Sequence, residues 1–316
     1  MTPVETVPGA RGTGRRERLR GLLGLMAALP IAGGARIAAA TQWAPRFSGV
    51  YSDWASAEQA ARRASATGYD SEKVAAVSFE IMCRRAPWDY PMLFWLERLG
   101  GQGTRVLDAG GHMGTKYIAF SGVLDVRRFD WTVFDLPGIV LAARKRQERH
   151  ELPERLRFVD RLADAPPCDI LIASGLLQYL DTPFAGFVAA LAQRPKVVLL
   201  NEVALRPDAG VFTVERIGPG RVPYQIRSRT DWDAEVDAMG YDVVDEWPIP
   251  QLSHTVPTHP WLPASDSRGC VLICRKARRD IIAGPGQVNR LAPPSQLPTK
   301  ARQKASHQSG ERQCHE

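Results

Sequence analysis

The sequence lacks a long apolar run and has no strong bias in its composition. Its apolar early stretch, Leu22–Ile31, contains Pro30 and is followed by two glycines and Arg36, so it is too short to span a bilayer. Charged residues make up 24% and hydrophobic residues 44% of the 316 positions, which excludes a mostly disordered, collagen-like or multi-span membrane chain. A chain of this length forms one large or two small domains with a buried core.

Cysteine is scarce, and its spacing argues against a disulfide framework. The cysteines number five, an odd count, and no pair is spaced Cys-x-x-Cys. Cys270 and Cys274 lie in one apolar run that predicts a strand, where residues four apart share a face but are too distant to bond. We expect free thiols in a reducing compartment, and we assign no residue to a metal site.

The main body of the chain carries no net positive charge. The formal net charge is +7, but residues 1–20 contribute +3 and residues 275–316 contribute +6, so the body between them carries −2. A protein that binds nucleic acid usually carries its positive charge on the folded body, so we expect no nucleic-acid partner. Residues 280–316 are rich in Pro, Gln, Ser and Lys, which predicts a disordered tail.

Residues 1–40 form a basic and apolar leader for which three interpretations stay open. Arg15, Arg16 and the apolar run, followed by the alanines 38–40, superficially resemble a secretory signal. The same pattern fits a helix lying in a membrane interface, and it fits a mobile leader. We favour the mobile leader in a cytoplasmic protein and keep peripheral contact with the inner face of the membrane as an alternative.

The segment 41–103 predicts a helical cap on the main domain. Ser56–Arg63, Glu72–Arg84 and Pro91–Leu99 have the composition of helices, and the last has Pro in its first turn. The segment is also rich in aromatic residues. These favour packing of the cap against the rest of the chain, where it would cover the active face.

From 104 to 279 short apolar runs alternate with amphipathic stretches, which predicts a parallel α/β sheet. The first five predicted strands are Arg105–Ala109, Trp131–Asp135, Leu156–Asp160, Asp169–Ser174 and Lys196–Glu202, with helices near 114–124, 138–150 and 183–194. An excursion at 203–229 holds two strand-like runs. A helix at Thr230–Met239, capped by Thr230, and strands at Tyr241–Ile249 and Gly269–Arg275 follow. We predict a seven-stranded, mostly parallel Rossmann-like sheet with helices on both faces and an antiparallel last strand.

The most informative stretch joins the first strand to its helix. Asp108 ends the strand, and Gly110, Gly111 and Gly114 follow in the turn, where they allow positive φ and close approach of a ligand. A dinucleotide-binding turn has the pattern GxGxxG, but His112 stands at the second glycine position, so that pattern fails. An acid two residues before the first glycine instead resembles motif I of S-adenosylmethionine-dependent methyltransferases.

Acidic residues also end the next two strands. Asp135 at the second strand can accept hydrogen bonds from both hydroxyls of a ribose, because a carboxylate is acceptor-only. Asp135 also fits a helix N-cap, because a helix follows it, and the two roles can coexist. We place the next residue, Leu136, beside the cofactor. Asp160 ends the third strand, where it would face an adenine.

The fourth strand runs into Ser174 and Gly175, which are small enough to leave room for a ligand. This stretch resembles motif IV of the same superfamily, whose loop lies beside the methyl donor. The resemblance points Gln178 and Tyr179 toward the acceptor. The alternative is a helix start with a buried tyrosine. Related O-methyltransferases often carry a histidine base where this chain has Gln178.

A narrower resemblance covers about 47–275. The stretches that carry it are SGVYSDWASAEQAA, GYDSEKV, PMLFWLERLG, LDAGGHMGTKY and LLQYLDTP. They are similar to a family of bacterial methyltransferase-like proteins often encoded among genes for surface-polysaccharide synthesis. The resemblance implies a methyltransferase with a glycan-linked acceptor. The aspartate usual after strand five is replaced here by Asn201 and Glu202.

We therefore predict methyl transfer from S-adenosylmethionine to an oxygen of a small molecule or sugar. A sugar hydroxyl must lose its proton, which a general base assists. The connection 250–268 overhangs the predicted site and carries His254, His259 and Asp266. We favour His254 as the base, with His259 and Glu202 as alternatives.

Two other functions stay open. A nicotinamide-dependent oxidoreductase or sugar epimerase would need GxGxxG and usually a Tyr-x-x-x-Lys pair, and the sequence has neither. A non-catalytic methyltransferase-like binding protein is the other. Intact Asp108, Gly110, Gly114 and Asp135 argue against it.

Overall fold

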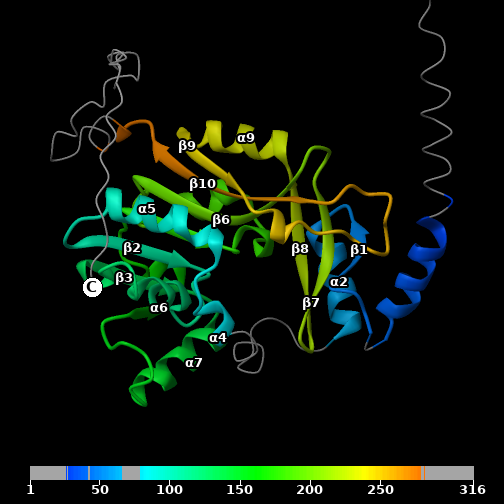
Figure 1. Cartoon of the computed structure of the whole chain (residues 1–316), viewed down its shortest axis with the longest axis horizontal. Coiled ribbons are helices and arrows are strands. Elements are labelled where there is room, and N and C mark those ends of the chain that lie inside the picture. The colour runs from blue at the N-terminus through cyan, green and yellow to red at the C-terminus, as the bar shows by residue number, and fades with distance from the viewer. Residues whose placement is uncertain (1–25, 27, 42, 66–78, 279–280, 282–316) are drawn as a thin grey trace, which may run out of the picture.

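The computed structural model describes residues 26, 28–41, 43–65, 79–278 and 281 (Figure 1). The predictions for the tail at 282–316, for most of the basic part of the leader and for residues 72–78 of the Glu72–Arg84 helix lie outside the described residues. The described part has an α/β fold, as predicted.

Seven strands form the main sheet, in the order β4-β3-β2-β5-β6-β10-β9. Their bounds are β2 Thr104–Ala109, β3 Phe129–Phe134, β4 Arg157–Val159, β5 Ile170–Ser174, β6 Val197–Arg206, β9 Tyr241–Pro248 and β10 Asp266–Cys274. The first five are mutually parallel, whereas β10 is antiparallel to both β6 and β9. The predicted strands and the antiparallel last strand are therefore present, but the predicted count of seven was too low, because three further strands extend the sheet to ten through β6 and β8. The strand order reverses between β2 and β5, at the ligand-binding switch point of such sheets.

Helices cover both faces of this sheet, which explains the nearly continuous apolar runs of its strands. One face packs α5 (Tyr90–Leu99), α6 (Thr115–Ser121) and α7 (Pro137–Glu148); the other packs α8 (Phe184–Ala189) and α9 (Arg229–Ala238). Neighbouring strand residues alternate between the two cores, as Val106 and Leu107 do. Short 3-10 turns complete the described elements: η1 Pro87–Asp89, η2 Val126–Arg128, η3 Leu162–Asp164, η4 Leu177–Tyr179 and η5 Pro250–Leu252.

The segment 41–103, predicted as a helical cap, also contains a strand. Its described residues include a strand, β1 (Phe47–Tyr51), besides α2 (Trp54–Ala64), α4 (Phe79–Met82) and α5. β1 pairs with β7 (Val211–Ile217), which pairs with β8 (Gly220–Ser228). These three strands, with α2 packed on β7 and β8, stand beside the main sheet in Figure 1. β1 was missed because its partner β7 lies far along the chain.

A β-bulge in β6 joins the two groups of strands. Leu200 pairs with Cys270 and Val203 with Arg268, so Asn201 and Glu202 together face Gly269. Glu202 has a φ of +62°, which is strained for a residue with a side chain. Beyond the bulge β6 continues to pair with β10 and also pairs with β8, at Leu205 and Arg206. The sequence predicted the end of this strand at Glu202.

Local predictions at single residues had mixed outcomes. The N-cap of α9 is Ser228, whose hydroxyl accepts a hydrogen bond from the Asp231 amide, and not Thr230 as predicted. Gly240 ends the same helix with a φ of +69°, as predicted. Cys168, Cys270 and Cys274 are buried free thiols, and Cys83 is a half-buried one.

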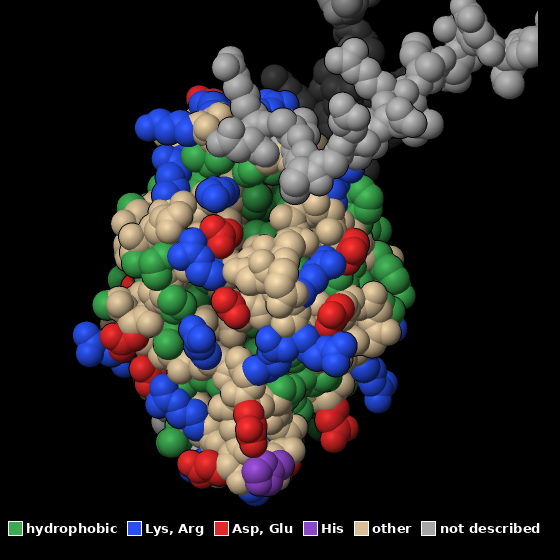
Figure 2. Space-filling view, turned by 90° about the vertical axis from the view of Figure 1, so that its left-hand side faces the viewer, with side chains coloured by type: hydrophobic (Ala, Val, Ile, Leu, Met, Phe, Trp, Pro, Cys, Tyr) green, Lys and Arg blue, Asp and Glu red, His purple; other side chains and the backbone are tan. Residues whose placement is uncertain are grey.

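Within the leader, residues 28–39 are helical. This helix exposes Leu29, Ile31 and Ile37, with exposed fractions of 54%, 61% and 74%. In the described part of the chain no helix is both long and apolar enough to cross a membrane. Figure 2 shows the face at the left-hand side of Figure 1, where basic and acidic side chains are interspersed.

Because Gly269 at the bulge is tightly packed and Gly186 is not, we expect alanine at these two positions to change the free energy of unfolding in opposite directions. A Cβ on Gly269 would lie 2.2 Å from the Trp247 indole, whereas a Cβ on Gly186, within α8, would meet nothing within 4 Å. We expect Gly269→Ala to lower the free energy of unfolding by about 1–3 kcal/mol through overpacking. Gly186→Ala should raise it by about 0.5–1 kcal/mol through helix propensity. Urea denaturation of both variants measures this, and equal stability of the two would contradict the packing assigned to Trp247.

Candidate functional site

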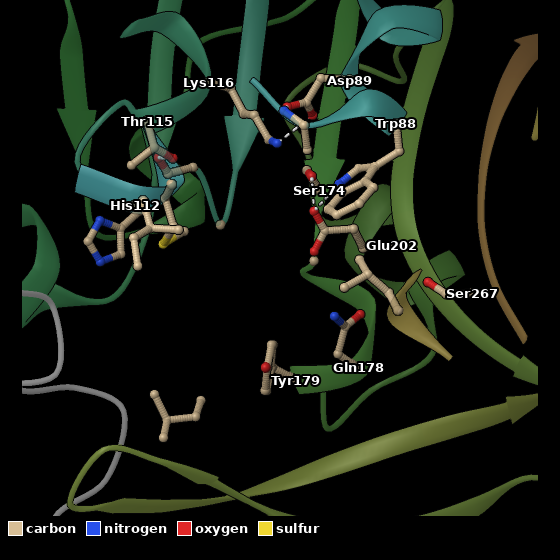
Figure 3. A pocket seen from close by; sticks show the side chains of 18 of the residues that line it. Trp88, Asp89, His112, Thr115, Lys116, Ser174, Gln178, Tyr179, Glu202 and Ser267 are labelled. Carbon is tan, nitrogen blue, oxygen red and sulfur yellow. Dashed lines mark hydrogen bonds and ion pairs between the residues drawn. The ribbon is translucent and has the colours of Figure 1, made fainter. Parts of the chain in front are cut away.

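A cavity of about 560 Å³ opens at the carboxyl ends of β2, β5 and β6 (Figure 3). Its size falls within the usual range for small-molecule sites. One wall is the glycine-rich turn after β2, and the opposite wall comes from β7 and β8. Residues 81–89 and Arg46 supply further lining, so the segment 41–103 does contribute to the predicted site.

The turn after β2 has the conformation that its glycines predict. Gly110 and Gly114 have φ values of +70° and +79°, and His112 between them has +55°. A Cβ on Gly111 would lie 2.5 Å from the Asp108 carboxyl carbon. The turn therefore forms a backbone cradle that side chains would fill. Gly110 and Gly111 line the cavity, whereas Gly114, which packs near Leu156, does not.

Asp108 lies at the floor of this cradle and is 1% exposed. Its Oδ2 accepts a hydrogen bond of 3.3 Å from the Trp131 indole, while its buried Oδ1 has no partner among the described residues. Burial raises the pKa of Asp108 to about 7. A buried carboxyl oxygen without a partner at a cavity wall has unused capacity for a ligand that donates hydrogen bonds.

His112 also borders the cavity, and sequence reasoning treated it only as a departure from a glycine pattern. Its ring stacks on Phe79 with 6.2 Å between the ring centroids. Its buried Nδ1 has no partner in the part of the chain that the structure describes. Burial lowers the pKa of His112 to about 4, so the ring is neutral at neutral pH.

Asp135 ties the turn to the start of α7. Its two oxygens accept hydrogen bonds of 2.7 Å from the amides of His112 and Leu136. The N-cap of α7 is Leu136, without a side-chain cap, so Asp135 is not the N-cap that the alternative interpretation expected. Asp135, Leu136 and Asp160 all lie outside the lining of this cavity. Asp135 is buried, whereas Leu136 is 41% exposed and Asp160 is half-buried after β4.

Glu202 reaches the cavity from the bulge in β6. Its Oε1 accepts hydrogen bonds from the Trp88 indole at 3.1 Å and from the Ser174 hydroxyl at 3.4 Å. Its Oε2 lies 3.3 Å from the place where a Cβ on Gly175 would sit, and Gly175 has a φ of +74°. The structure thus brings together three predicted residues, Ser174, Gly175 and Glu202.

A buried ion pair holds this wall in place. Lys116 Nζ lies 2.6 Å from Asp89 Oδ1, and the Asp89 side chain is fully buried. Asp89 also accepts hydrogen bonds from the Ala86 amide and from Asn201 Nδ2, and the Trp247 indole donates to Asn201 Oδ1. The network links η1, α6 and the bulge, which positions Trp88 against Glu202.

A further buried acid at this cavity, Glu215 on β7, was missed from the sequence. It is 2% exposed and accepts hydrogen bonds from the Tyr179 hydroxyl at 2.6 Å and from Arg46 Nε at 2.8 Å. Burial raises its pKa, although both partners oppose the shift. The only available signal was an acid inside the strand-like run FTVERI, and its partner Arg46 is 169 positions away.

The three candidate bases do not share one site. His254 lines the cavity beside Glu202 and packs against Phe47, with 4.6 Å between ring centroids, and against Tyr224. Burial lowers the pKa of His254 to about 4. His259 lines a separate hollow and not this cavity. Asp266 begins β10 and pairs with Arg268 outside the cavity lining.

Gln178 and Tyr179 both line the cavity, and both belong to the 3-10 turn η4, so they also fit the alternative of a helix start. Gln178 is 5% exposed, and its buried Oε1 has no hydrogen-bond partner among the described residues. No group of three or more His, Cys, Asp or Glu side chains in the described chain could hold a metal ion.

No protein-family model and no curated protein matches the chain. Similar solved structures include the glycopeptide N-methyltransferase MtfA complexed with S-adenosylmethionine, with 16% identity and a TM-score of 0.42 over 60% of this chain and 95% of that one. Magnesium protoporphyrin IX methyltransferase from Synechocystis PCC 6803, with bound S-adenosylhomocysteine, has 18% identity and a TM-score of 0.38, over 58% of this chain and 80% of that one. The 4+2 cyclase SpnF has 15% identity and a TM-score of 0.44, over 72% of this chain and 98% of that one. A likeness of this degree establishes neither a shared activity nor a shared ligand.

Asp108 predicts a pH-dependent difference between the protein and its Asp108→Asn variant. Because the folded pKa of Asp108, about 7, exceeds its unfolded value, its stabilising contribution is present at low pH and lost as pH rises through 7. From pH 5 to pH 8 we expect the variant to gain stability relative to the parent by on the order of 2 kcal/mol. His112 and His254 titrate in both proteins and cancel. A difference in unfolding free energy that does not change with pH would contradict the burial of an ionisable Asp108.

Proposed function

We propose that the chain is an S-adenosylmethionine-dependent methyltransferase acting on a small-molecule or sugar acceptor. The observation that carries the proposal is the unpartnered, buried Asp108 oxygen at a glycine cradle on the switch point of the sheet. S-adenosylmethionine bears an ammonium group, which suits that oxygen, and a carboxylate, which suits backbone amides of the turn. When bound it supplies an activated methyl group.

The charge of the cradle separates this proposal from a nicotinamide enzyme. A dinucleotide places its diphosphate on the glycine-rich turn at a helix N-terminus. Here the Asp108 carboxyl group lies against Gly111, with 2.5 Å between its carboxyl carbon and the position of a Gly111 Cβ. An ionised Asp108 would repel a diphosphate there and would attract a cation. The cradle therefore suits a positively charged ligand.

The acceptor would occupy the part of the cavity between Glu202 and β8. Tyr179 and Tyr224 stack edge to face there with 5.5 Å between ring centroids and provide apolar surface for a sugar ring or another small molecule. His254, whose pKa of about 4 leaves it neutral, is available to accept a proton from an acceptor hydroxyl. Positioning the acceptor in a cavity away from bulk water would supply much of the remaining acceleration.

The proposal predicts that S-adenosylmethionine binds more tightly as pH rises. Its ammonium stays charged below about pH 7.7, while Asp108, with a pKa of about 7, becomes ionised. Between pH 5.5 and 7.5 we expect the Kd to fall by about 10- to 30-fold. Calorimetric titration at several pH values measures this.

The control is Asp108→Asn, which should bind weakly and without this pH dependence. The parent protein, supplied with methyl-labelled S-adenosylmethionine and cell-envelope extracts, should transfer the label to a component of the extract. Binding that is equally tight at both pH values removes Asp108 from the cofactor site. Binding without label transfer, over a broad set of extracts, would favour the non-catalytic alternative.

We also propose peripheral membrane contact through the leader. The helix at 28–39 exposes three large apolar side chains, Leu29, Ile31 and Ile37, which could enter a membrane interface. The full chain should therefore sediment with anionic vesicles, and a chain beginning at Trp43 should stay in the supernatant. Equal sedimentation of the two proteins would disprove membrane contact through this segment.

A further inference from the structure

Among the described residues, two cavity acids, Asp89 and Glu215, have ion-pair partners, whereas Glu202, like Asp108, has none. Lys116 neutralises Asp89, and Arg46 neutralises Glu215. In the described chain, no ion pair reaches Glu202, which is half-buried and bonded only by the neutral Trp88 and Ser174 donors. A half-buried carboxylate with no opposite charge is costly unless a ligand supplies that charge.

Gln178 provides an independent sign of a missing ligand. Its Oε1 is buried, lines the cavity and has no partner among the described residues. Glu202 Oε2 and Gln178 Nε2 lie 3.3 Å and 3.7 Å from one point, the position of a Cβ on Gly175. Figure 3 shows the Gln178 amide pointing toward the Glu202 carboxylate. The two side chains therefore flank one small volume beside Gly175.

Three side-chain donors on this side of the cavity already have acceptors. The Trp88 indole and the Ser174 hydroxyl donate to Glu202, and the Tyr179 hydroxyl donates to Glu215. Two oxygens, Glu202 Oε2 and Gln178 Oε1, accept no hydrogen bond from the described residues. An ammonium group has three donors and can donate to both oxygens at once, whereas a hydroxyl has one donor and can donate to only one of them.

We propose that Glu202 and Gln178 form a subsite for an ammonium group, so that the molecule bound there is an amine. Its identity as the methyl acceptor rests on the proposed function. The aromatic rings of Trp88, Tyr179 and Tyr224 line the same cavity and favour a cation near their faces. The strained φ of +62° at Glu202 is part of this design, because the bulge aims the carboxylate into the cavity.

The test compares two probes that differ in one group, 2-phenylethylamine and 2-phenylethanol. At pH 7.5 the amine is an ammonium ion. Calorimetry on protein saturated with S-adenosylmethionine should show the amine binding about tenfold or more tighter than the alcohol, as expected for a charge-assisted hydrogen bond. In Glu202→Gln, which retains an oxygen for Trp88, the preference should disappear.

Two further variants complete the design. Glu97→Gln removes the same charge from an exposed position on α5 and should keep the preference. Gln178→Leu should weaken amine binding about threefold or more, and it should not lower the melting temperature, since it removes a buried unsatisfied group.

Equal binding of amine and alcohol to the parent protein, or a preference that survives in Glu202→Gln, would overturn the subsite. Loss of amine binding on saturation with S-adenosylmethionine would also overturn it, by assigning Glu202 to the methyl donor. Absence of S-adenosylmethionine binding with the amine preference intact would refute the proposed function and leave the amine subsite standing.

Discussion

The two-residue bulge at Asn201 and Glu202 is the constraint on which the cavity depends. Without it, β6 would alternate regularly, and Glu202 would follow the pleat of the strand. With it, Asn201 is buried against Asp89 and Trp247, and Glu202 adopts a positive φ and meets Trp88. β6 then continues far enough to pair with β8. One local irregularity thus positions a carboxylate and attaches the second group of strands.

The charges around the cavity form a consistent pattern. Two acids are held by internal cations, and two, Asp108 and Glu202, are not. Asp108 lies at the glycine cradle, and Glu202 lies beside the Gly175 turn. Carboxylates kept without cations cost stability, and proteins retain such groups where a ligand compensates them. The cavity therefore suits cationic ligands at two points, where we propose the methyl donor and an amine.

Local sequence signals predicted most of the main sheet and the glycine cradle of the site. The alternation of apolar runs placed the seven strands, and the Asp108 to Gly114 spacing placed the cradle, because these features depend on neighbours in sequence. The residues that were missed or misplaced depend on distant partners. β1 needs β7, Glu215 needs Arg46, and the bulge needs Gly269 under the Trp247 indole. His259 lies outside the cavity because its loop is held elsewhere by a distant contact, in which the Gly49 amide donates a hydrogen bond to the neighbouring Thr258 hydroxyl.

The measurement that tests the central claim most directly is a crystal structure of the protein with S-adenosylhomocysteine, which retains the ammonium and carboxylate of the methyl donor. The account predicts ligand density in the cavity, with the ammonium nitrogen within hydrogen-bond distance of Asp108 Oδ1 and the sulfur directed toward Glu202. Density for the ligand away from the glycine cradle, or an ammonium that contacts neither Asp108 oxygen, would contradict it.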